Sequence, residues 1–484
     1  MSERSLPHDL PTHLLINGQW IDGARDPFDV ADPATGDVLV TVANASPEQG
    51  SRALTAAVEA QDAWAATSPR ERADVLRRVF DGVRARHEDF AKVMTLEMGK
   101  SLVEAEGEVT YGSEFLRWFS EEAVRIHGRY GTLPEGTLRQ LVMRRPVGPC
   151  LLLTPWNFPL AMATRKMAPA LAAGCTVVLR PAQATPLTTL LLGRVLCEAG
   201  VPDGVVNILT SSKHDVTDTV LADPRLRKMS FTGSTPVGKS LLAKASDNVL
   251  RTSMELGGNA PFIVFEDADL DVAVSQARAA KLRNIGQACT AANRFIVHAS
   301  LVDEFTARLV DRFADEVVGD GLADDTTLGP LIDADARDDV HALVTGAVEA
   351  GATLLCGGEI PQGPGHFYPP TVLGDVAVDA KILDHEIFGP VAVITTFGDE
   401  EEALRIANSV PVGLSGYVFT RDLARIQRMG ARLETGMIGV NTGVLSNAAA
   451  PFGGVKESGL GREGGFEGIE EYLETIYLAL PDPS

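Results

Sequence analysis

The hydrophobic pattern changes its period along the first quarter of the chain. Residues 13–22 alternate around the Asn17-Gly pair, which predicts two short strands joined by a tight turn. From about 47 to 126, Ala, Leu and Val recur every three or four residues, which predicts helices that start near Pro47 and Pro69. This part of the chain is therefore expected to be mainly helical after an N-terminal hairpin.

The pattern then alternates over residues 128–147, where Gly and Pro frame a second alternating run and predict a protruding hairpin. Downstream, short apolar runs alternate with helical patterns, and a second region of this kind extends from 261 to about 440. Such a rhythm predicts mostly parallel, doubly wound sheets in two lobes. Gly/Pro-rich joints at 319–330 and 357–370 are expected to be loops. The first region has expected strands at 147–153, 175–179, 205–209 and 228–231, and expected helices at 162–172 and 188–199.

Composition excludes several classes of protein. The chain has 484 residues, too many for one hydrophobic core, and 45% of them are hydrophobic, as in ordinary globular proteins. A formal net charge of −22 argues against nucleic acid or an anionic membrane as partner. No apolar run is long enough to span a bilayer.

The cysteines and the N-terminus indicate the compartment. The five cysteines are scattered and have no metal-ligand spacing, so we expect neither a disulfide framework nor a metal site. The first ten residues have no basic end followed by an apolar core, so we expect no signal peptide and a cytoplasmic protein. The cysteines are Cys150, Cys175, Cys197, Cys289 and Cys356.

One of these cysteines has neighbours that suggest chemistry. Cys289 follows Gly286, and Glu255 lies upstream beside Gly257-Gly258. A thiol and a carboxylate suffice for covalent catalysis, in which the thiolate attacks and the carboxylate takes a proton from water. The alternative is that Cys289 is a small buried apolar residue. The glycines favour catalysis, because they let the backbone approach a ligand closely.

A second motif suggests a different class of function. Residues 233–240, Gly-Ser-Thr-Pro-Val-Gly-Lys-Ser, match the P-loop pattern GxxxxGK[ST], and 263–267 could supply the partner strand. A P-loop NTPase is therefore the rival hypothesis. It does not explain Cys289, Glu255 and Asn157 together. A P-loop is also expected at the start of a βα series, whereas this loop lies within one.

Six ordered motifs resemble the aldehyde dehydrogenase superfamily, and the likeness extends from about residue 13 to 477. The resemblance implies an aldehyde dehydrogenase-like α/β fold with a Rossmann-type cofactor domain, an α/β catalytic domain and a β-hairpin oligomerisation arm. The motifs are residues 155–159, 231–235, 255–259, 286–289, 386–390 and 451–456. The expected ranges are 1–126 and 148–253 for the dinucleotide-binding domain, 254–440 for the catalytic domain, and 127–147 with 441–484 for the arm and C-terminal segment. The arm implies a homo-oligomer, either a dimer or a tetramer.

The resemblance also implies catalytic roles. Cys289 would be the nucleophile, and Glu255 the general base. The Asn157 amide, with the Cys289 backbone N–H, would stabilise the oxyanion. Lys166 and Glu463 would lie on a proton route to the base. The plainer alternatives are turn chemistry for Asn157 and solvated charges for Lys166 and Glu463.

By the same resemblance, a dinucleotide would bind along a series of loops. Gly233 and Ser234 would lie beside the pyrophosphate, which suits a helix N-terminus. Relatives often have Glu where Gln183 stands, and Lys where Arg180 stands. Neutral Gln183 does not repel a 2′-phosphate and Arg180 can pair with one, so we expect NADP, or use of both NADP and NAD. The alternative is that both residues simply tolerate NAD. The full expected set is Thr154, Pro155, Trp156, Arg180, Gln183, Gly233, Ser234, Gly238, Leu256, Gly257, Glu386 (nicotinamide ribose) and Phe388 (near the ring).

The substrate expectation depends on Arg165, Arg283 and Ser446, which match the carboxylate-binding set of the succinate-semialdehyde branch. Phe158 and Phe452 would complete the site. Succinate semialdehyde is therefore expected, and glutarate semialdehyde or another aldehyde stays open. Ala291 stands where some relatives have a second cysteine, which argues against a redox switch there.

Overall fold

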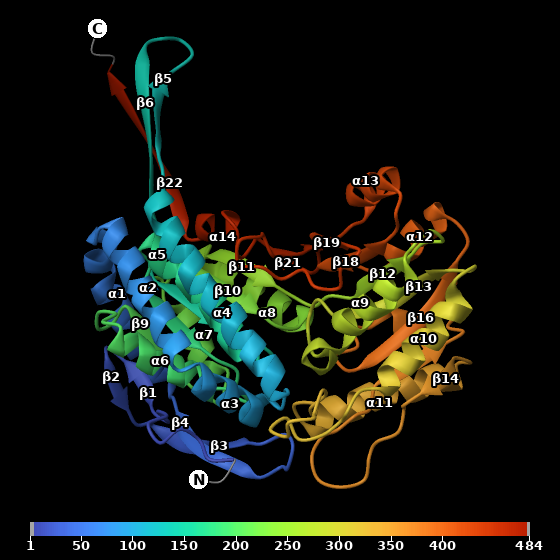
Figure 1. Cartoon of the computed structure of the whole chain (residues 1–484). Coiled ribbons are helices and arrows are strands. Elements are labelled where there is room, and N and C mark those ends of the chain that lie inside the picture. Colours follow the sequence, from blue (N-terminus) through green and yellow to red (C-terminus); the bar gives the residue numbers. More distant parts are fainter. Residues whose placement is uncertain (1–3, 482–484) are drawn as a thin grey trace.

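The computed structural model describes residues 4–481, arranged as two α/β lobes and a narrow arm (Figure 1). The first three residues and the last three lie outside the described residues. They include part of the segment expected not to be a signal peptide, and the ends of the expected ranges 1–126 and 441–484. No helix in the described part of the chain combines the length and apolarity that a membrane span requires.

The first lobe contains an eight-stranded sheet with the order β2-β1-β9-β8-β7-β10-β11-β21. Its five central strands are parallel, as the βα rhythm predicts, and an antiparallel hairpin and β21 flank them. The hairpin turns at Asn17, whose φ is 52°. The strands are β1 (Leu14–Ile16), β2 (Gln19–Ile21), β7 (Cys150–Leu153), β8 (Val177–Arg180), β9 (Val206–Ile208), β10 (Lys228–Thr232), β11 (Arg251–Glu255) and β21 (Gly459–Leu460).

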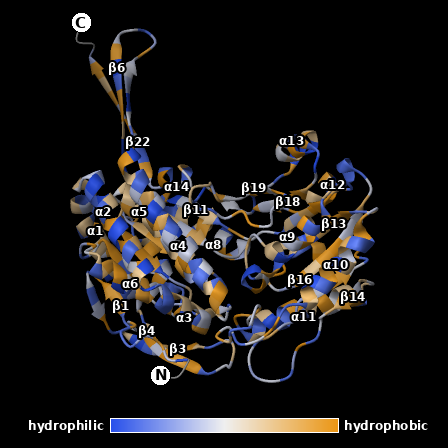
Figure 2. Ribbon diagram, viewed as in Figure 1, coloured by the Kyte–Doolittle hydropathy of each residue, from blue (hydrophilic) through white to orange (hydrophobic). Residues whose placement is uncertain are grey.

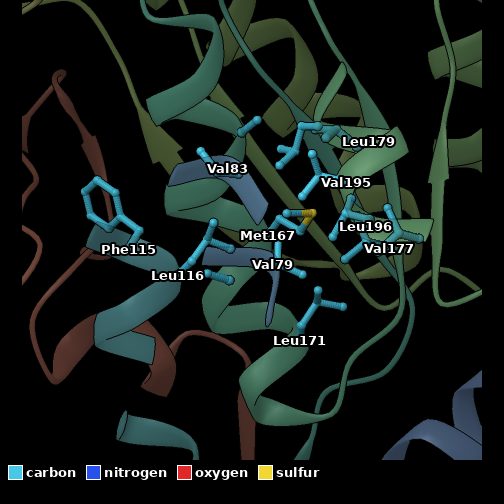
Figure 3. Packing of buried hydrophobic residues seen from close by; sticks show 14 of the residues in the cluster. Val79, Val83, Phe115, Leu116, Met167, Leu171, Val177, Leu179, Val195 and Leu196 are labelled. Atoms are coloured by element: carbon cyan, nitrogen blue, oxygen red, sulfur yellow. The ribbon is translucent and has the colours of Figure 1, made fainter. Parts of the chain in front are cut away.

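Helices cover this sheet and form the largest apolar core, where α2, α4, α5 and α6 pack with β8 (Figure 3). Pro47 and Pro69 begin helices as predicted, each after a serine whose side chain accepts a backbone hydrogen bond. The helices are α1 (Pro47–Ala66), α2 (Pro69–Ala85), α3 (His87–Met98), α4 (Leu102–Glu122), η1 (Ala123–Arg125), α5 (Pro159–Ala173), α6 (Leu187–Glu198), α7 (Asp215–Ala222), α8 (Thr235–Ala245) and η2 (Ser246–Asn248).

The second lobe contains a seven-stranded sheet with the order β14-β15-β16-β13-β12-β18-β19, parallel except for β14. Residues 357–370 contain no helix or strand, as expected of a loop. The chain leaves the first sheet at Glu255 and enters the second at Ala260, but the expected domain limits stay a prediction. The elements are β12 (Ala260–Val264), α9 (Leu270–Leu282), η3 (Arg283–Gly286), β13 (Ala292–His298), α10 (Val302–Ala314), α11 (Ala334–Glu349), β14 (Thr353–Cys356), β15 (Thr371–Gly374), η4 (Lys381–Asp384), β16 (Val391–Phe397), α12 (Glu400–Ala407), β18 (Ser415–Phe419), α13 (Leu423–Arg432) and β19 (Met437–Val440).

The arm is a three-stranded antiparallel sheet that projects from the first lobe (Figure 1). The predicted hairpin forms from β5 (Arg129–Thr132) and β6 (Leu138–Pro146), and the C-terminal strand β22 (Leu473–Pro481) pairs along β6. The sequence pattern did not predict this third strand. Hydrophobic positions occur along β6 and β22 (Figure 2). The remaining elements are β3 (Arg25–Ala31), β4 (Val38–Asn44), β17 (Val412–Gly413), β20 (Val455–Lys456) and α14 (Glu467–Glu470).

Candidate active site

Cys289 opens onto a pocket formed by segments far apart in the sequence. All five residues expected to contact substrate line the same pocket as Cys289: Phe158, Arg165, Arg283, Ser446 and Phe452. Tyr111 of α4 lines it as well, which the sequence did not indicate.

A left-handed turn aims Cys289 into this pocket. Asn284, Ile285 and Gly286 have φ values of 55°, 62° and 73°. Such values are unfavourable for a β-branched residue such as Ile285. The half-buried Glu104 carboxylate holds the turn by accepting a hydrogen bond of 2.7 Å from the Asn284 N–H. A side chain at Gly286 would place Cβ 2.2 Å from the Gly389 carbonyl, so this position requires glycine.

The Asn157 side chain lies beside the same turn. Its Nδ2 donates one hydrogen bond of 2.9 Å to the Gln287 carbonyl, two residues before Cys289. An amide nitrogen carries two hydrogens, so one remains for an oxyanion. The Asn157 backbone carbonyl accepts hydrogen bonds of 3.0 Å from Lys100 Nζ and from Asn284 Nδ2. These bonds fix the loop on which the amide sits.

A buried ion pair between Lys100 and Glu108 supports this loop from behind. Lys100 Nζ also lies 4.3 Å from the centre of the Phe158 ring. Glu108 accepts hydrogen bonds of 3.0 and 3.1 Å from the N–H groups of Leu160 and Ala161. This carboxylate satisfies the helix N-terminus, so α5 begins at Pro159 rather than at the expected 162. Neither role was predicted, because Glu108 lies inside a helix and Lys100 just before it, in a region with an ordinary helical pattern.

Glu255 is buried at the carboxyl end of β11, at the base of the site. Burial raises the pKa of its carboxyl well above the ordinary value, and the nearby Glu463 raises it further, whereas Lys166 and Arg165 lower it. Lys166 Nζ donates to Glu463 Oε1 at 2.5 Å and to Ser230 Oγ at 3.0 Å. The structure therefore brings together the three residues that the sequence proposed for base catalysis and proton transfer, and none of them is a solvated surface charge.

The electrostatic setting of the thiol is unfavourable to ionisation. Burial raises the pKa of Cys289 to about 12, and the Arg165 charge partly opposes this effect. The thiol is therefore protonated near neutral pH in the ligand-free protein.

Arg165 is the most informative side chain in the pocket. Its Nη2 donates to the Tyr111 hydroxyl, and its Cζ lies 4.0 Å from the centre of the Phe452 ring. Its Nη1 is 3.8 Å from Glu463 Oε2. Within the described residues, Arg165 Nε and Nη1 have no hydrogen-bond partner, although the side chain is buried. A buried guanidinium with spare donors is costly unless an anion binds there.

Arg283 also lies beside Tyr111. Its Cζ is 5.8 Å from the centre of the Tyr111 ring and 5.1 Å from the centre of the Phe158 ring. Arg283 is half-buried at the start of η3, so the two guanidinium groups face one pocket from α5 and from η3. Ser446 belongs to the C-terminal segment and also lines this pocket.

The expected nicotinamide end of the dinucleotide site lies near Glu386. Its Oε1 accepts a hydrogen bond of 3.1 Å from the Gly258 N–H, and burial raises its pKa to about 7. A side chain at Gly257 would place Cβ 2.7 Å from Glu386 Oε2. Phe388 packs edge-on against Trp156, with ring centres 5.5 Å apart.

The segment that matches the P-loop pattern has a different structure. Helix α8 begins at Thr235, so most of residues 233–240 are helical and cannot wrap around a phosphate. Lys239 is exposed and pairs with Glu457 at 2.8 Å. The P-loop NTPase hypothesis is therefore wrong.

The same helix N-terminus remains available to an anion. Gly233 and Ser234 precede α8, and the Ser234 side chain makes no capping hydrogen bond. A side chain at Gly238 would place Cβ 2.3 Å from Leu256 Cδ2, so glycine lets α8 pack closely on the turn after β11.

Unsatisfied polar atoms mark the adenosine side of the expected cofactor site. Arg180 Nη2 donates to the carbonyls of Ser211 at 3.0 Å and Lys213 at 3.3 Å. In the part of the chain that the structure covers, Arg180 Nε and Thr154 Oγ1 are buried without a partner. Gln183 is exposed nearby in sequence. Spare buried donors and a free helix N-terminus fit a dinucleotide.

Known proteins resemble this chain over nearly its whole length. A succinate-semialdehyde dehydrogenase of Paenarthrobacter nicotinovorans is 59% identical, over 92% of this chain and 99% of that protein. An NADP⁺-dependent succinate-semialdehyde dehydrogenase of Escherichia coli is 45% identical, over 96% of this chain and 97% of that protein. A glutarate-semialdehyde dehydrogenase of Pseudomonas aeruginosa is also 45% identical, over 96% of each chain.

A solved structure agrees in fold. The betaine aldehyde dehydrogenase of Staphylococcus aureus in complex with NAD⁺ superposes with a TM-score of 0.95 at 33% identity, covering 98% of this chain and 95% of that one. The model of the aldehyde dehydrogenase family matches residues 20–477. The chain belongs to the aldehyde dehydrogenase family.

Proposed function

We propose that this chain oxidises succinate semialdehyde to succinate with NADP or NAD as hydride acceptor. The observation that carries the substrate assignment is Arg165, a buried guanidinium in the pocket of Cys289, two of whose nitrogens donate no hydrogen bond within the described residues. A substrate with a carboxylate at its far end would satisfy these donors. The names of the P. nicotinovorans and E. coli relatives support the same substrate.

The proposed reaction proceeds through a covalent intermediate. The Cys289 thiol must first lose its proton. The thiolate then attacks the aldehyde carbon, and the free hydrogen of the Asn157 amide, with the Cys289 N–H, stabilises the oxyanion of the thiohemiacetal. The thiohemiacetal then loses its hydrogen as a hydride, for which a bound dinucleotide would be the acceptor. A thioester remains on Cys289. Glu255 then takes a proton from water, and the resulting hydroxide hydrolyses the thioester. Lys166 and Arg165 favour the ionised form of Glu255 that this step needs.

NADP is favoured over NAD as the cofactor. Gln183 has no charge to repel a 2′-phosphate, and Arg180 offers a cation with a spare Nε. The E. coli relative uses NADP⁺ by name, whereas the S. aureus enzyme was solved with NAD⁺. We therefore propose that Thr154, Arg180, Gln183 and Ser234 hold the adenosine and phosphate groups. We propose that Glu386 and Phe388 contact the nicotinamide end, and that Pro155, Trp156, Gly233, Gly238, Leu256 and Gly257 shape the groove between.

Glutarate semialdehyde is the alternative substrate, because the P. aeruginosa relative acts on it by name. It has the same distal carboxylate and one more methylene group. The half-buried positions of Arg283 and Ser446 at the outer side of the pocket are compatible with either length.

We also propose that the protein is a homo-oligomer, a dimer or a tetramer, and that it is cytoplasmic. The arm supports assembly, because it projects from the body and exposes Tyr130, Met143 and Tyr477. Light scattering at micromolar concentration tests the assembly. A monomer there would exclude it.

The covalent mechanism is tested by separating its two halves. Cys289→Ala should abolish oxidation while NADP binding, measured by fluorescence titration, stays nearly intact. Glu255→Gln should give one rapid turnover of reduced cofactor and then stall, because acylation precedes the step that needs the base. Steady turnover by Cys289→Ala would refute the nucleophile. A panel of succinate, glutarate and uncharged aldehydes with both cofactors tests the substrate.

A further inference from the structure

The general base lies at the end of a polar stripe on an otherwise apolar sheet. Strands β10 and β11 pair in parallel register, with Ser230 opposite Ser253 and Thr232 opposite Glu255. Side chains alternate across a sheet, so Lys228, Ser230, Ser253 and Glu255 share one face. The opposite face is formed by the apolar residues Met229, Phe231 and Met254.

Hydrogen bonds connect this stripe in two segments. In the first, Lys166 Nζ donates to Glu463 Oε1 at 2.5 Å and to Ser230 Oγ at 3.0 Å. In the second, Lys228 Nζ donates to Ser253 Oγ at 2.5 Å, and Ser253 Oγ donates to Glu471 Oε2 at 3.0 Å.

The two segments meet at the paired serines. Ser230 and Ser253 are register partners on adjacent strands, and such strands lie about 4.8 Å apart. Both hydroxyl groups point to the same face, so rotation of either one brings them within reach of each other. Tyr472 packs over this junction, with its ring centre 4.9 Å from Lys228 Nζ.

The far end of the stripe reaches solvent. Lys166, Lys228 and Ser230 are completely buried, whereas the side chain of Glu471 is 21% exposed. Buried polar groups are costly unless they are paired, and here two hydrogen-bonded segments reach from Glu463, close to Glu255, to the surface beside the root of the arm. The elements concerned, α5, β10, β11 and α14, lie together in the first lobe (Figure 1).

We propose that this line, from Glu463 through Lys166, Ser230 and Ser253 to Glu471, with Lys228 hydrogen-bonded to Ser253, carries the proton released during thioester hydrolysis from Glu255 to solvent. The proposal rests on the function proposed above, in which Glu255 is the base. Lys228, Ser253 and Glu471 are its new members.

The step balances in atoms and electrons. Water forms a C–O bond to the thioester carbon, the C–S bond to Cys289 breaks, and its electron pair leaves as the thiolate. One proton of the water passes to Glu255, and the other stays on the product acid until that acid ionises. Glu255 must lose its proton before the next turnover.

Lys228 is suited to pass a proton on rather than hold it. Burial lowers its pKa from the ordinary value, so the neutral amine is accessible. The groups that face it are Cys150 of β7, Cys175 before β8, Arg251 of β11, and Glu471 and Tyr472 of the C-terminal segment.

The test compares Ser253→Ala with Ser253→Thr, which keeps the hydroxyl. The control is Ser113→Ala; Ser113 is a buried serine of α4 that donates to the Thr110 carbonyl. Rapid mixing with the best aldehyde of the panel measures the first turnover of reduced cofactor and the steady rate separately. An activated ester such as p-nitrophenyl acetate acylates the thiol without cofactor and so measures deacylation alone.

In Ser253→Ala, the first turnover and the ester burst should equal those of the wild type. Deacylation should slow roughly tenfold and its solvent deuterium isotope effect should rise, since a positioned proton-transfer group contributes about 10²–10⁴-fold and a water can replace part of it. Ser253→Thr should restore the rate, and Ser113→Ala should change nothing. Glu471→Gln should repeat the effect and shift the pH profile of deacylation.

The route is overturned if Ser253→Ala and Glu471→Gln deacylate at the wild-type rate with an unchanged isotope effect. It is equally overturned if acylation falls in the same proportion as deacylation, because the serine is then structural. Failure of the proposed function is seen earlier and separately, as wild-type enzyme that prefers an uncharged aldehyde. The route is then tested with that aldehyde.

Discussion

Replacement of Arg165 by Met is the sharpest test of the substrate carboxylate. Met keeps an unbranched side chain against the Phe452 ring but removes the charge and both spare donors. One charge-assisted hydrogen bond contributes about 1.5–3 kcal/mol, which corresponds to roughly 10- to 150-fold in catalytic efficiency. Because Arg165 is buried and two of its nitrogens donate no hydrogen bond within the described residues, the upper end of this range applies. Arg283 is half-buried, so Arg283→Met should lose about tenfold.

The readout must separate carboxylate binding from a second effect of the same charge. Arg165 also lowers the pKa values of Cys289 and Glu255, so its loss should slow every aldehyde somewhat. The assay is therefore the ratio of kcat/KM for succinate semialdehyde to that for butanal, which has the same number of carbons. This ratio should fall about 100-fold in Arg165→Met. It should not change in Arg278→Met, whose guanidinium pairs with Glu316 at 2.5 and 2.8 Å.

Equal losses for both aldehydes would refute the reasoning. Arg165 would then be a structural residue, and the substrate would be an aldehyde that is still to be identified. The double variant of Arg165 and Arg283 adds a further check. If both arginines bind one anion, the double variant should lose less than the product of the single losses, because their effects are coupled.

Three further outcomes are expected. Gln183→Glu should raise the KM for NADP far more than the KM for NAD, because a carboxylate repels the 2′-phosphate; steady-state kinetics with both cofactors measures this. Lys100→Met, combined with Glu108→Gln so that no buried carboxylate is left unpaired, should lower kcat about tenfold with little change in KM, because the Asn157 loop loses a support. Its circular dichroism spectrum controls for folding. Alkylation of Cys289 in the ligand-free protein, followed by peptide mass spectrometry, should keep accelerating through pH 9, since its pKa is near 12; a plateau below pH 8 would contradict this environment.

The sequence predicted the elements whose signals are local. The alternation at 13–22 and the apolar runs of the first sheet depend on short-range periodicity, and each became a strand. The observed element boundaries differ from the predicted ones where a residue distant in sequence makes a hydrogen bond at the helix end. Helix α5 starts three residues earlier than expected because Glu108, on another helix, satisfies its first N–H groups. Strand β22 was missed because its pairing with β6 joins segments more than 300 residues apart, and no local pattern encodes that partner.

The candidate site divides in the same way. Cys289, Glu255 and Asn157 were found because each stands in a motif that resembles the aldehyde dehydrogenase superfamily. Tyr111 and Lys100 were missed because they occupy ordinary positions in and before a helix, and their chemistry arises only when α4 packs against α5.

The turn at Asn284 and Ile285 shows how tertiary contacts can stabilise a conformation that the local sequence disfavours. A left-handed conformation costs about 1–3 kcal/mol for such residues, so the local sequence disfavours it. Glu104 offsets this cost by accepting the Asn284 N–H, and the Asn284 side chain bridges the Asn157 and Gln287 carbonyls. The strained turn and the oxyanion loop therefore stabilise each other. A substitution at Glu104 should consequently disturb catalysis at Cys289, although Glu104 lines a neighbouring pocket rather than the pocket of Cys289.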